Sequence, residues 1–172
     1  MGLWIRLDNG AVARTESSVS EFAFQDLIPD NHCYGCGPHN AHGLRIKSYW
    51  DGDEAVSTFT PQPFHMAGPT NVLNGGIIGT VIDCHCICTA FADAYRREGR
   101  AIGSDPQLWY ATASLKVDYL KPTPIDQPLT LRAKVIEAGP KKTRVTCSLY
   151  AGDQECARGE VLAIRVAHGW RD

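Results

Sequence analysis

A proline-free segment from Gly75 to Arg97 constrains the fold more than any other part of the chain. Its apolar side chains recur at helical spacing, on a stripe that contains Ile77, Val81, Cys84, Cys88, Phe91 and Tyr95. Because the segment is apolar nearly all round, it is typical of a buried helix rather than a surface helix. Gly99 stands where such a helix would end. The sequence therefore predicts one long buried helix over 75–97.

Strand patterns lie on both sides of this segment. Before it, alternating residues predict a strand over 44–50 and, after an Asp51-Gly52 turn, a return strand over 54–60. After it come four strand candidates that we expect to form an antiparallel meander, over 111–120, 129–137, 143–151 and 155–166. An antiparallel sheet needs an apolar partner for its inner face, and the helix is the only candidate. We expect an α+β fold in which the sheet wraps around the helix.

Length and composition indicate a single ordinary globular domain. The chain has 172 residues and a formal net charge of −2, so nothing points to nucleic acid. We expect residues 1–42 to be an N-terminal extension and lead-in, with a short helix over 21–27, and residues 43–172 to be the main domain. No leader pattern and no apolar run long enough to span a bilayer stand out, which favours a cytoplasmic protein without a membrane partner. Seven cysteines, an odd number, fit free thiols in a reducing compartment.

Two polar residues, Asp83 and His85, interrupt the apolar helix. A buried charge costs several kcal/mol unless it is paired or used, so each residue needs an explanation. At about 100° per residue, Asp83 shares a face with the small residue Gly79, whereas His85 points about 160° away from Asp83. The two cannot form a catalytic dyad on this helix. We expect His85 to satisfy a buried hydrogen bond, with contact to a partner subunit as the alternative.

The start of the helix can bind a developing negative charge. A helix N-terminus leaves backbone N–H groups without partners, and glycines let a ligand approach them closely. The amides of Gly75 and Gly76 could therefore stabilise the oxyanion of a thioester carbonyl, while Asp83 acts as general base or as nucleophile. The structural alternative is that the glycines pack the helix against the sheet and Asp83 caps a neighbouring backbone.

The stretch "LNGGIIGTVID" resembles the signature of the PaaI-like hotdog-fold acyl-CoA thioesterases, in which a His-Gly-Gly turn opens the central helix. An acidic residue follows that His by nine positions, which corresponds to Asp83 here. Asn74 replaces the His, although Asn is also a good helix N-cap. "TASLKVDYLKPTP" is similar to the family's next strand, and "CYGCGPHNAHGL" to a lead-in of some members. The resemblance implies a hotdog fold, a homodimer or homotetramer, and Thr112 approaching Asp83 from a neighbouring subunit.

The thioesterase hypothesis requires groups that hold the substrate. Five residues are candidates for substrate binding: His65, Trp109, Tyr110, Lys141 and Lys142. The first could line a pocket from its loop, the two aromatic residues could form an apolar wall, and the lysines could meet the phosphates of coenzyme A. Each also has an ordinary explanation as a surface or strand residue.

Cys33 and Cys36, with His32, His39 and His42 nearby, suggest a metal site. A structural zinc site needs four ligands, usually in two separated pairs, and no second Cys-x-x-Cys pair is present. Successive cysteines of the 84–88 stretch should point to different faces of the helix. We therefore expect no metal and no cofactor, and a tight turn that uses Gly35 and Gly37.

The reading that fits these features best is a homo-oligomeric acyl-CoA thioesterase. Three alternatives remain open. A regulator would bind acyl-CoA without turnover, and a hotdog hydratase would add water to an enoyl thioester and leave the thioester bond intact. A zinc-binding interaction module would lose its fold with chelators.

Overall fold

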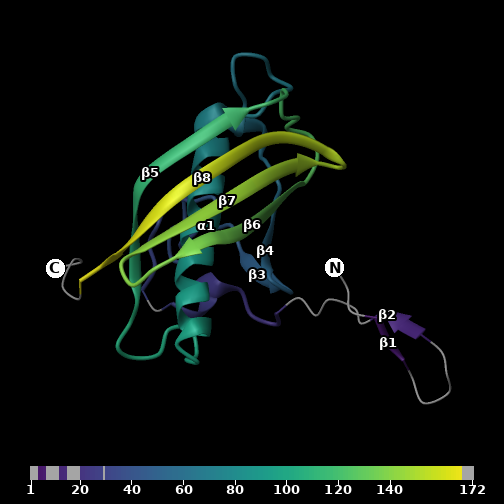
Figure 1. Ribbon diagram of the computed structural model, residues 1–172. Coiled ribbons are helices and arrows are strands. Elements are labelled where there is room, and N and C mark those ends of the chain that lie inside the picture. The colour runs from purple at the N-terminus through teal and green to yellow at the C-terminus, as the bar shows by residue number, and fades with distance from the viewer. Residues whose placement is uncertain (1–3, 7–11, 15–19, 29, 168–172) are drawn as a thin grey trace.

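The computed structural model describes residues 4–6, 12–14, 20–28 and 30–167 (Figure 1). Two short 3-10 helices, η1 and η2, accompany one α-helix and eight strands within these residues. The elements are β1 (Trp4–Arg6), β2 (Val12–Arg14), η1 (Phe24–Leu27), β3 (Ser48–Asp51), β4 (Glu54–Phe59), η2 (Pro63–His65), α1 (Gly75–Arg97), β5 (Trp109–Tyr119), β6 (Leu129–Ala138), β7 (Lys142–Ala151) and β8 (Gln154–Val166). The helix 75–97 is confirmed at both ends.

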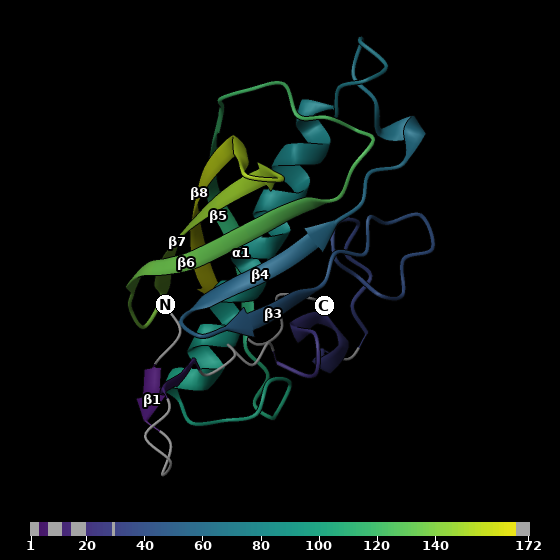
Figure 2. The same ribbon diagram turned by 90° about the vertical axis from the view of Figure 1, so that its right-hand side faces the viewer.

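Six strands form one antiparallel sheet in the order β3-β4-β6-β7-β8-β5. The sheet curves around α1, which lies against its concave face (Figures 1 and 2). This arrangement is the hotdog fold, as expected. The expected four-strand meander is wrong in one respect: β5 pairs with β8 and not with β6. The connection over residues 120–128, which contains Pro122, Pro124 and Pro128, is too long and too stiff for a hairpin and carries the chain across to the other side.

The strand expected over 44–50 is also shorter than its alternation suggests. β3 begins only at Ser48. Arg45 has a φ of 52°, a left-handed conformation that interrupts an extended chain. The backbone N–H groups of Leu44 and Ile46 donate to Tyr34 and Gly35 of the lead-in segment instead of to another strand. The alternation of apolar and polar residues over 44–47 therefore reflects packing against the lead-in loop and not pairing in a sheet.

The core fills the space between α1 and the concave face of the sheet. Val81, Ile82 and Ala92 of the helix are fully buried. At Gly159 of β8 a Cβ atom would lie 2.4 Å from Cγ2 of Ile82, so a side chain there would hold the helix away from the sheet. By length and composition α1 could also span a membrane, contrary to the sequence expectation, but 67% of its most apolar window is buried inside the protein. Burial of that kind is typical of a core helix.

Residues of the lead-in belong to the same core. Phe24 and Cys36 are buried in the cluster that contains α1, and the helix expected over 21–27 is the 3-10 turn η1. The division of the chain at residue 42 stays a prediction, although its two sides share this core. The β1–β2 pair was not predicted, because its short segments lack clean periodicity.

Candidate active site

Asp83 and Thr112 form the centre of the candidate site. Oγ1 of Thr112 donates a hydrogen bond of 2.7 Å to Oδ1 of Asp83. Asp83 lies in the third turn of α1, and Thr112 lies near the start of β5 in the same chain. The expectation that Thr112 reaches the acid from a neighbouring subunit is therefore wrong: the partner of Asp83 is supplied by the strand that follows the helix.

A β-bulge accompanies Thr112. In the pairing of β5 with β8, Thr112 opposes Ala163 and Ser114 opposes Leu162, so Ala113 is an extra residue on β5. A bulge of this kind bends the strand and changes the direction of the neighbouring side chains. The irregularity lies directly beside the hydroxyl that contacts Asp83.

Asp83 faces a cleft of about 610 Å³ between α1, β5 and the lead-in segment. Its lining consists of Cys33, Tyr34, Gly35, Gly75, Gly76, Gly79, Thr80, Asp83, Cys84, Leu115, Val117 and Tyr119. Burial raises the pKa of Asp83, and the hydrogen bond from Thr112 opposes that rise because it favours the ionised carboxylate. A carboxylate of raised pKa in a cleft is a candidate base or nucleophile.

The N-terminus of α1 opens into the same cleft, but only one of its two glycine amides is available. Oδ1 of Asn74 accepts a hydrogen bond of 2.8 Å from the N–H of Gly76, so the expected role of Gly76 in an oxyanion hole is contradicted in this conformation. Among the described residues no hydrogen bond is donated by the N–H of Gly75. Tyr119 packs against Gly75 and donates a bond of 2.8 Å to its carbonyl oxygen.

Helix geometry separates the two chemical groups. Asp83 lies eight positions after Gly75, which at 1.5 Å per residue is about 12 Å along the helix axis. A single carbonyl group therefore cannot contact both the Gly75 amide and the Asp83 carboxylate of one chain.

His65 does not line the cleft. It is 9% exposed, stacks against Phe59 and accepts a hydrogen bond of 3.0 Å from the N–H of Gln62. Its carbonyl oxygen accepts from the N–H of Asn74 at 2.9 Å. His65 thus positions the start of α1 and is not among the residues that line this cleft.

The other four proposed substrate-binding residues lie elsewhere as well. Trp109 and Tyr110 begin β5 near the C-terminal end of α1, where Tyr110 is buried. Lys141 and Lys142 lie at the β6–β7 turn, beside Arg165, which pairs with Glu98 just after α1. None of the four lines the cleft of its own chain. For the two β5 residues the reason is strand direction: β5 runs antiparallel to α1, so its end at Tyr119, and not its start at Trp109, meets the helix N-terminus.

The residues that sequence reasoning missed follow two simple periodicities. Leu115, Val117 and Tyr119 alternate along β5 and so face one side of the strand. On α1 the lining residues recur every four positions from Gly75 and Gly76 onward. Both patterns are visible in the sequence. Only the structure, with β5 at the edge of the sheet, shows that these residues of α1 and β5 line the same cleft.

His85 has the structural role that was expected. The side chain is fully buried, its Nδ1 lies 2.8 Å from Oγ of Ser48, and its Nε2 lies 3.1 Å from the carbonyl oxygen of Ala55. Gln25 completes the group through two hydrogen bonds to Ser48. Burial lowers the pKa of His85 to about 4, so the ring is neutral at physiological pH.

The comparison with known proteins agrees with this fold. The family model of the thioesterase superfamily matches residues 70–157. A thioesterase superfamily protein from Shewanella loihica PV-4 is 35% identical, with 74% of this chain and 96% of that chain covered and a TM-score of 0.59. The chain therefore belongs to the thioesterase superfamily, and thioester hydrolysis is the activity that this membership supports. No curated protein matches the chain.

Two more distant structures share the fold. The PaaI protein of E. coli, from the phenylacetic acid degradation operon, is 17% identical, with coverage of 72% of this chain and 81% of that chain and a TM-score of 0.59. A thioesterase from Haemophilus influenzae is 15% identical, with coverage of 72% and 79% and a TM-score of 0.58. The resemblance to PaaI-like hotdog proteins is confirmed at the level of the fold.

Proposed function

We propose that the protein is an acyl-CoA thioesterase in which Asp83 attacks the thioester or activates the water that does so. The observation that carries this proposal is the hydrogen bond from Thr112 to Asp83 at the wall of an open cleft. As a base, Asp83 takes a proton from water while hydroxide adds to the carbonyl carbon. As a nucleophile, it forms a mixed anhydride that water then hydrolyses. In both routes the C–S bond breaks and the thiolate leaves.

The oxyanion of the intermediate needs a donor, and we assign this role to the Gly75 N–H of a second copy of the chain. The separation of about 12 Å along α1 excludes the Gly75 amide of the same chain. β5 is an edge strand of the sheet, so its outer backbone groups can pair with another strand. Leu115, Tyr119 and Leu120 are 40%, 57% and 43% exposed along or just after it. A homo-oligomer would cover this apolar edge and complete the site.

A reducing cytoplasmic location is consistent with this reaction. All seven cysteines are free in the structure, as they would be in such a compartment. The location remains part of the proposal.

The test is a panel of acyl-CoA and acyl-carrier-protein thioesters incubated with the wild-type enzyme, with products identified by mass spectrometry. Hydrolysis predicts free acid and free thiol in equal amounts. An enoyl-CoA that gains one water and keeps its thioester bond would instead support the hydratase. Saturable binding of acyl-CoA without any product would support the regulator. Thiol-trapping dyes are unsuitable, because seven cysteines would compete for them.

A further inference from the structure

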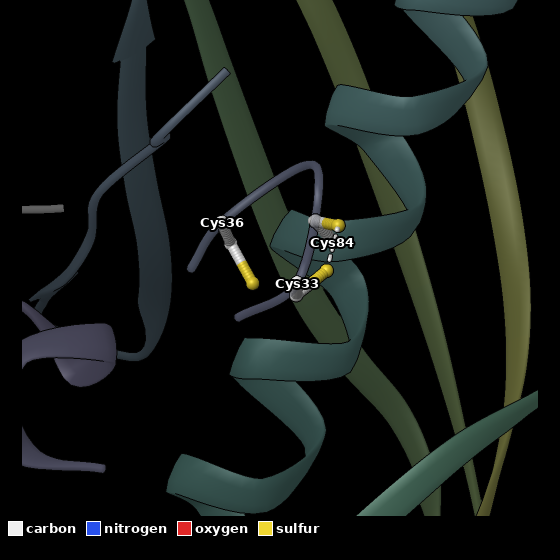
Figure 3. Close-up of side chains that lie close together, drawn as sticks. All are labelled: Cys33, Cys36 and Cys84. Carbon is white, nitrogen blue, oxygen red and sulfur yellow. Dashed lines mark hydrogen bonds between the residues drawn. The ribbon is translucent and has the colours of Figure 1, made fainter. Parts of the chain in front are cut away.

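Four cysteines converge where the lead-in segment crosses α1. The sulfur atoms of Cys33, Cys36 and Cys84 lie within 4.8 Å of one another, and Figure 3 shows the two lead-in side chains directed at the helix. Cys33 Sγ lies 3.6 Å from Cys84 Sγ. Cys36 Sγ lies 3.9 Å from Sγ of Cys88, one helical turn beyond Cys84. A Cys-x-x-Cys pair of the loop thus meets a pair at i and i+4 on one helix face.

The sequence expectation overlooked this second pair. Cys86 does point away from Cys84 and Cys88, and it is fully buried. However, residues four apart on a helix are neighbours. Cys84 and Cys88 therefore lie on the same face of α1, the face that meets the lead-in segment. The sequence analysis looked for a second Cys-x-x-Cys motif and therefore missed Cys84 and Cys88, a pair of possible ligands one helical turn apart.

The sulfur atoms of Cys33, Cys36 and Cys84 are close enough for one metal ion, since all three lie within 4.8 Å of one another. Cys88 stands outside this group of three and approaches it through Cys36. Zinc binds four thiolates at about 2.3 Å in a tetrahedron, which places neighbouring sulfur atoms about 3.8 Å apart. Two contacts of the cluster, 3.6 Å between Cys33 and Cys84 and 3.9 Å between Cys36 and Cys88, lie on either side of this value. A disulfide would join only two of the sulfur atoms and leave the others without a partner.

The loop is shaped to approach the helix. A Cβ atom on Gly35 would lie 2.3 Å from Sγ of Cys84, so only glycine allows this contact. The N–H of Gly37 donates to the carbonyl oxygen of Cys33 at 2.8 Å and closes the expected tight turn. Asn31 holds both cysteines: its Oδ1 accepts from the Cys33 N–H at 3.0 Å, and its Nδ2 lies 3.8 Å from Cys36 Sγ. Donors to sulfur stabilise a thiolate ligand.

Burial agrees with a ligand role for three of the four cysteines. Cys36, Cys84 and Cys88 are 6%, 8% and 2% exposed. The deprotonated thiolate is the form that binds metal.

We propose that Cys33, Cys36, Cys84 and Cys88 bind one Zn²⁺ ion, which fastens the lead-in segment to α1. Each thiol releases its proton when it binds the ion. With four protein ligands the site is closed, and its role is structural. Because Cys33, Gly35 and Cys84 also line the cleft beside Asp83, the ion would fix one wall of the active site. This proposal rests on the sulfur cluster alone and does not depend on the thioesterase assignment.

The test is the metal content of the full-length protein purified without chelators from zinc-supplemented cells. We expect one zinc ion per chain in the wild type. Cys36→Ser and Cys84→Ser should lose most of the zinc, whereas Cys156→Ala, a buried cysteine of β8 outside the cluster, should retain it. Replacement of the zinc by Co²⁺ in the wild type should produce thiolate charge-transfer bands and the intense visible bands of tetrahedral cobalt. The Cys88→Ala variant should weaken these bands.

Metal removal provides a second readout that does not require a mutant to fold. A chelator should lower the Tm of the wild-type protein, and added Zn²⁺ should restore it. Wild-type protein with fully reduced thiols, negligible zinc and no cobalt–thiolate bands would overturn the proposal. A Cys33–Cys84 disulfide in freshly purified protein would overturn it too. Unchanged cobalt bands in Cys88→Ala would overturn the assignment of the fourth ligand. None of these tests measures thioester hydrolysis, so their results are independent of the proposed function.

Discussion

Thr112 and Asp83, 29 residues apart in the sequence, are joined by a hydrogen bond of 2.7 Å between β5 and α1 of one chain. The bond favours the ionised carboxylate, against the burial that raises the pKa of Asp83. A base or nucleophile must be ionised to act, so the hydroxyl extends activity to lower pH.

Thr112→Val removes this hydroxyl and keeps the shape and β-propensity of the side chain. We expect the acidic limb of the kcat/KM profile to move to higher pH, because the pKa of Asp83 rises further. At pH values below the pKa of Asp83, kcat/KM of the variant should be about tenfold lower than that of the wild type, the loss expected for a hydrogen bond to a charged group. Thr112→Ser retains the donor and should restore the wild-type profile. If the valine variant keeps the wild-type limb, the bond does not control the ionisation of Asp83.

Gly75→Pro tests the oxyanion donor without disturbing the helix. Proline has no N–H but is favoured at the first helical position, and the extended backbone of Asn74 (ψ 133°) suits the residue before a proline. We expect kcat to fall by about 10²–10³-fold, the usual cost of losing one such donor. Gly75→Ala adds the same first carbon beside Tyr119 but keeps the N–H, and should be far more active.

A mixing experiment tests whether the donor comes from a second copy. Asp83→Asn and Gly75→Pro chains, each inactive alone, are unfolded together and refolded. A mixed dimer contains one site with an intact Asp83 and an intact Gly75, so activity should reappear. Activity that stays absent although mixed dimers form would show that both groups act within one chain.

Gly79 lies in the cleft with room for a side chain. A Cβ there would be 4.0 Å from Cδ2 of Leu115, an ordinary contact, so Gly79→Ala should raise the free energy of unfolding by about 1 kcal/mol through helix propensity. Gly79→Leu should fill the cleft and raise KM. Gly159→Ala is the matched control: its Cβ would meet Ile82 at 2.4 Å and should destabilise the protein. Urea unfolding and steady-state kinetics measure both effects, and an unchanged KM in Gly79→Leu would place the substrate elsewhere.

The buried imidazole of His85 makes stability depend on pH. Its pKa is about 4 in the folded protein and 6.5 as a free side chain, so the unfolded chain binds the proton more tightly. The stabilising contribution is complete above pH 6.5 and is lost as pH falls toward 4, by about 3 kcal/mol in all. His85→Gln should be less stable at pH 7 yet lose less stability between pH 7 and pH 4. Equal pH dependence of urea unfolding in the two proteins would contradict this account.

Much of the fold could be predicted because the signals are local. The proline-free apolar run fixed the ends of α1, and alternation located the strands after it to within two residues. The position of β5 beside β8 could not be predicted, since register and strand order depend on contacts between distant segments. The same limit explains the site. Asp83 is recognisable by its burial within an apolar helix, but its bond to Thr112 within one chain, and the approach of Cys33 and Cys36 to Cys84, exist only in the folded protein.

The most direct test of the central claim is kcat/KM for hydrolysis of the best acyl-CoA substrate by wild type and Asp83→Asn, followed by loss of thioester absorbance. The amide has nearly the shape of the carboxylate but can neither accept the proton of water nor attack the carbonyl carbon. We predict a fall of at least about 10²-fold, the lower range for loss of a general base, with circular dichroism and oligomeric state unchanged. Activity within a few-fold of wild type in a folded Asp83→Asn protein would show that the chemistry lies elsewhere.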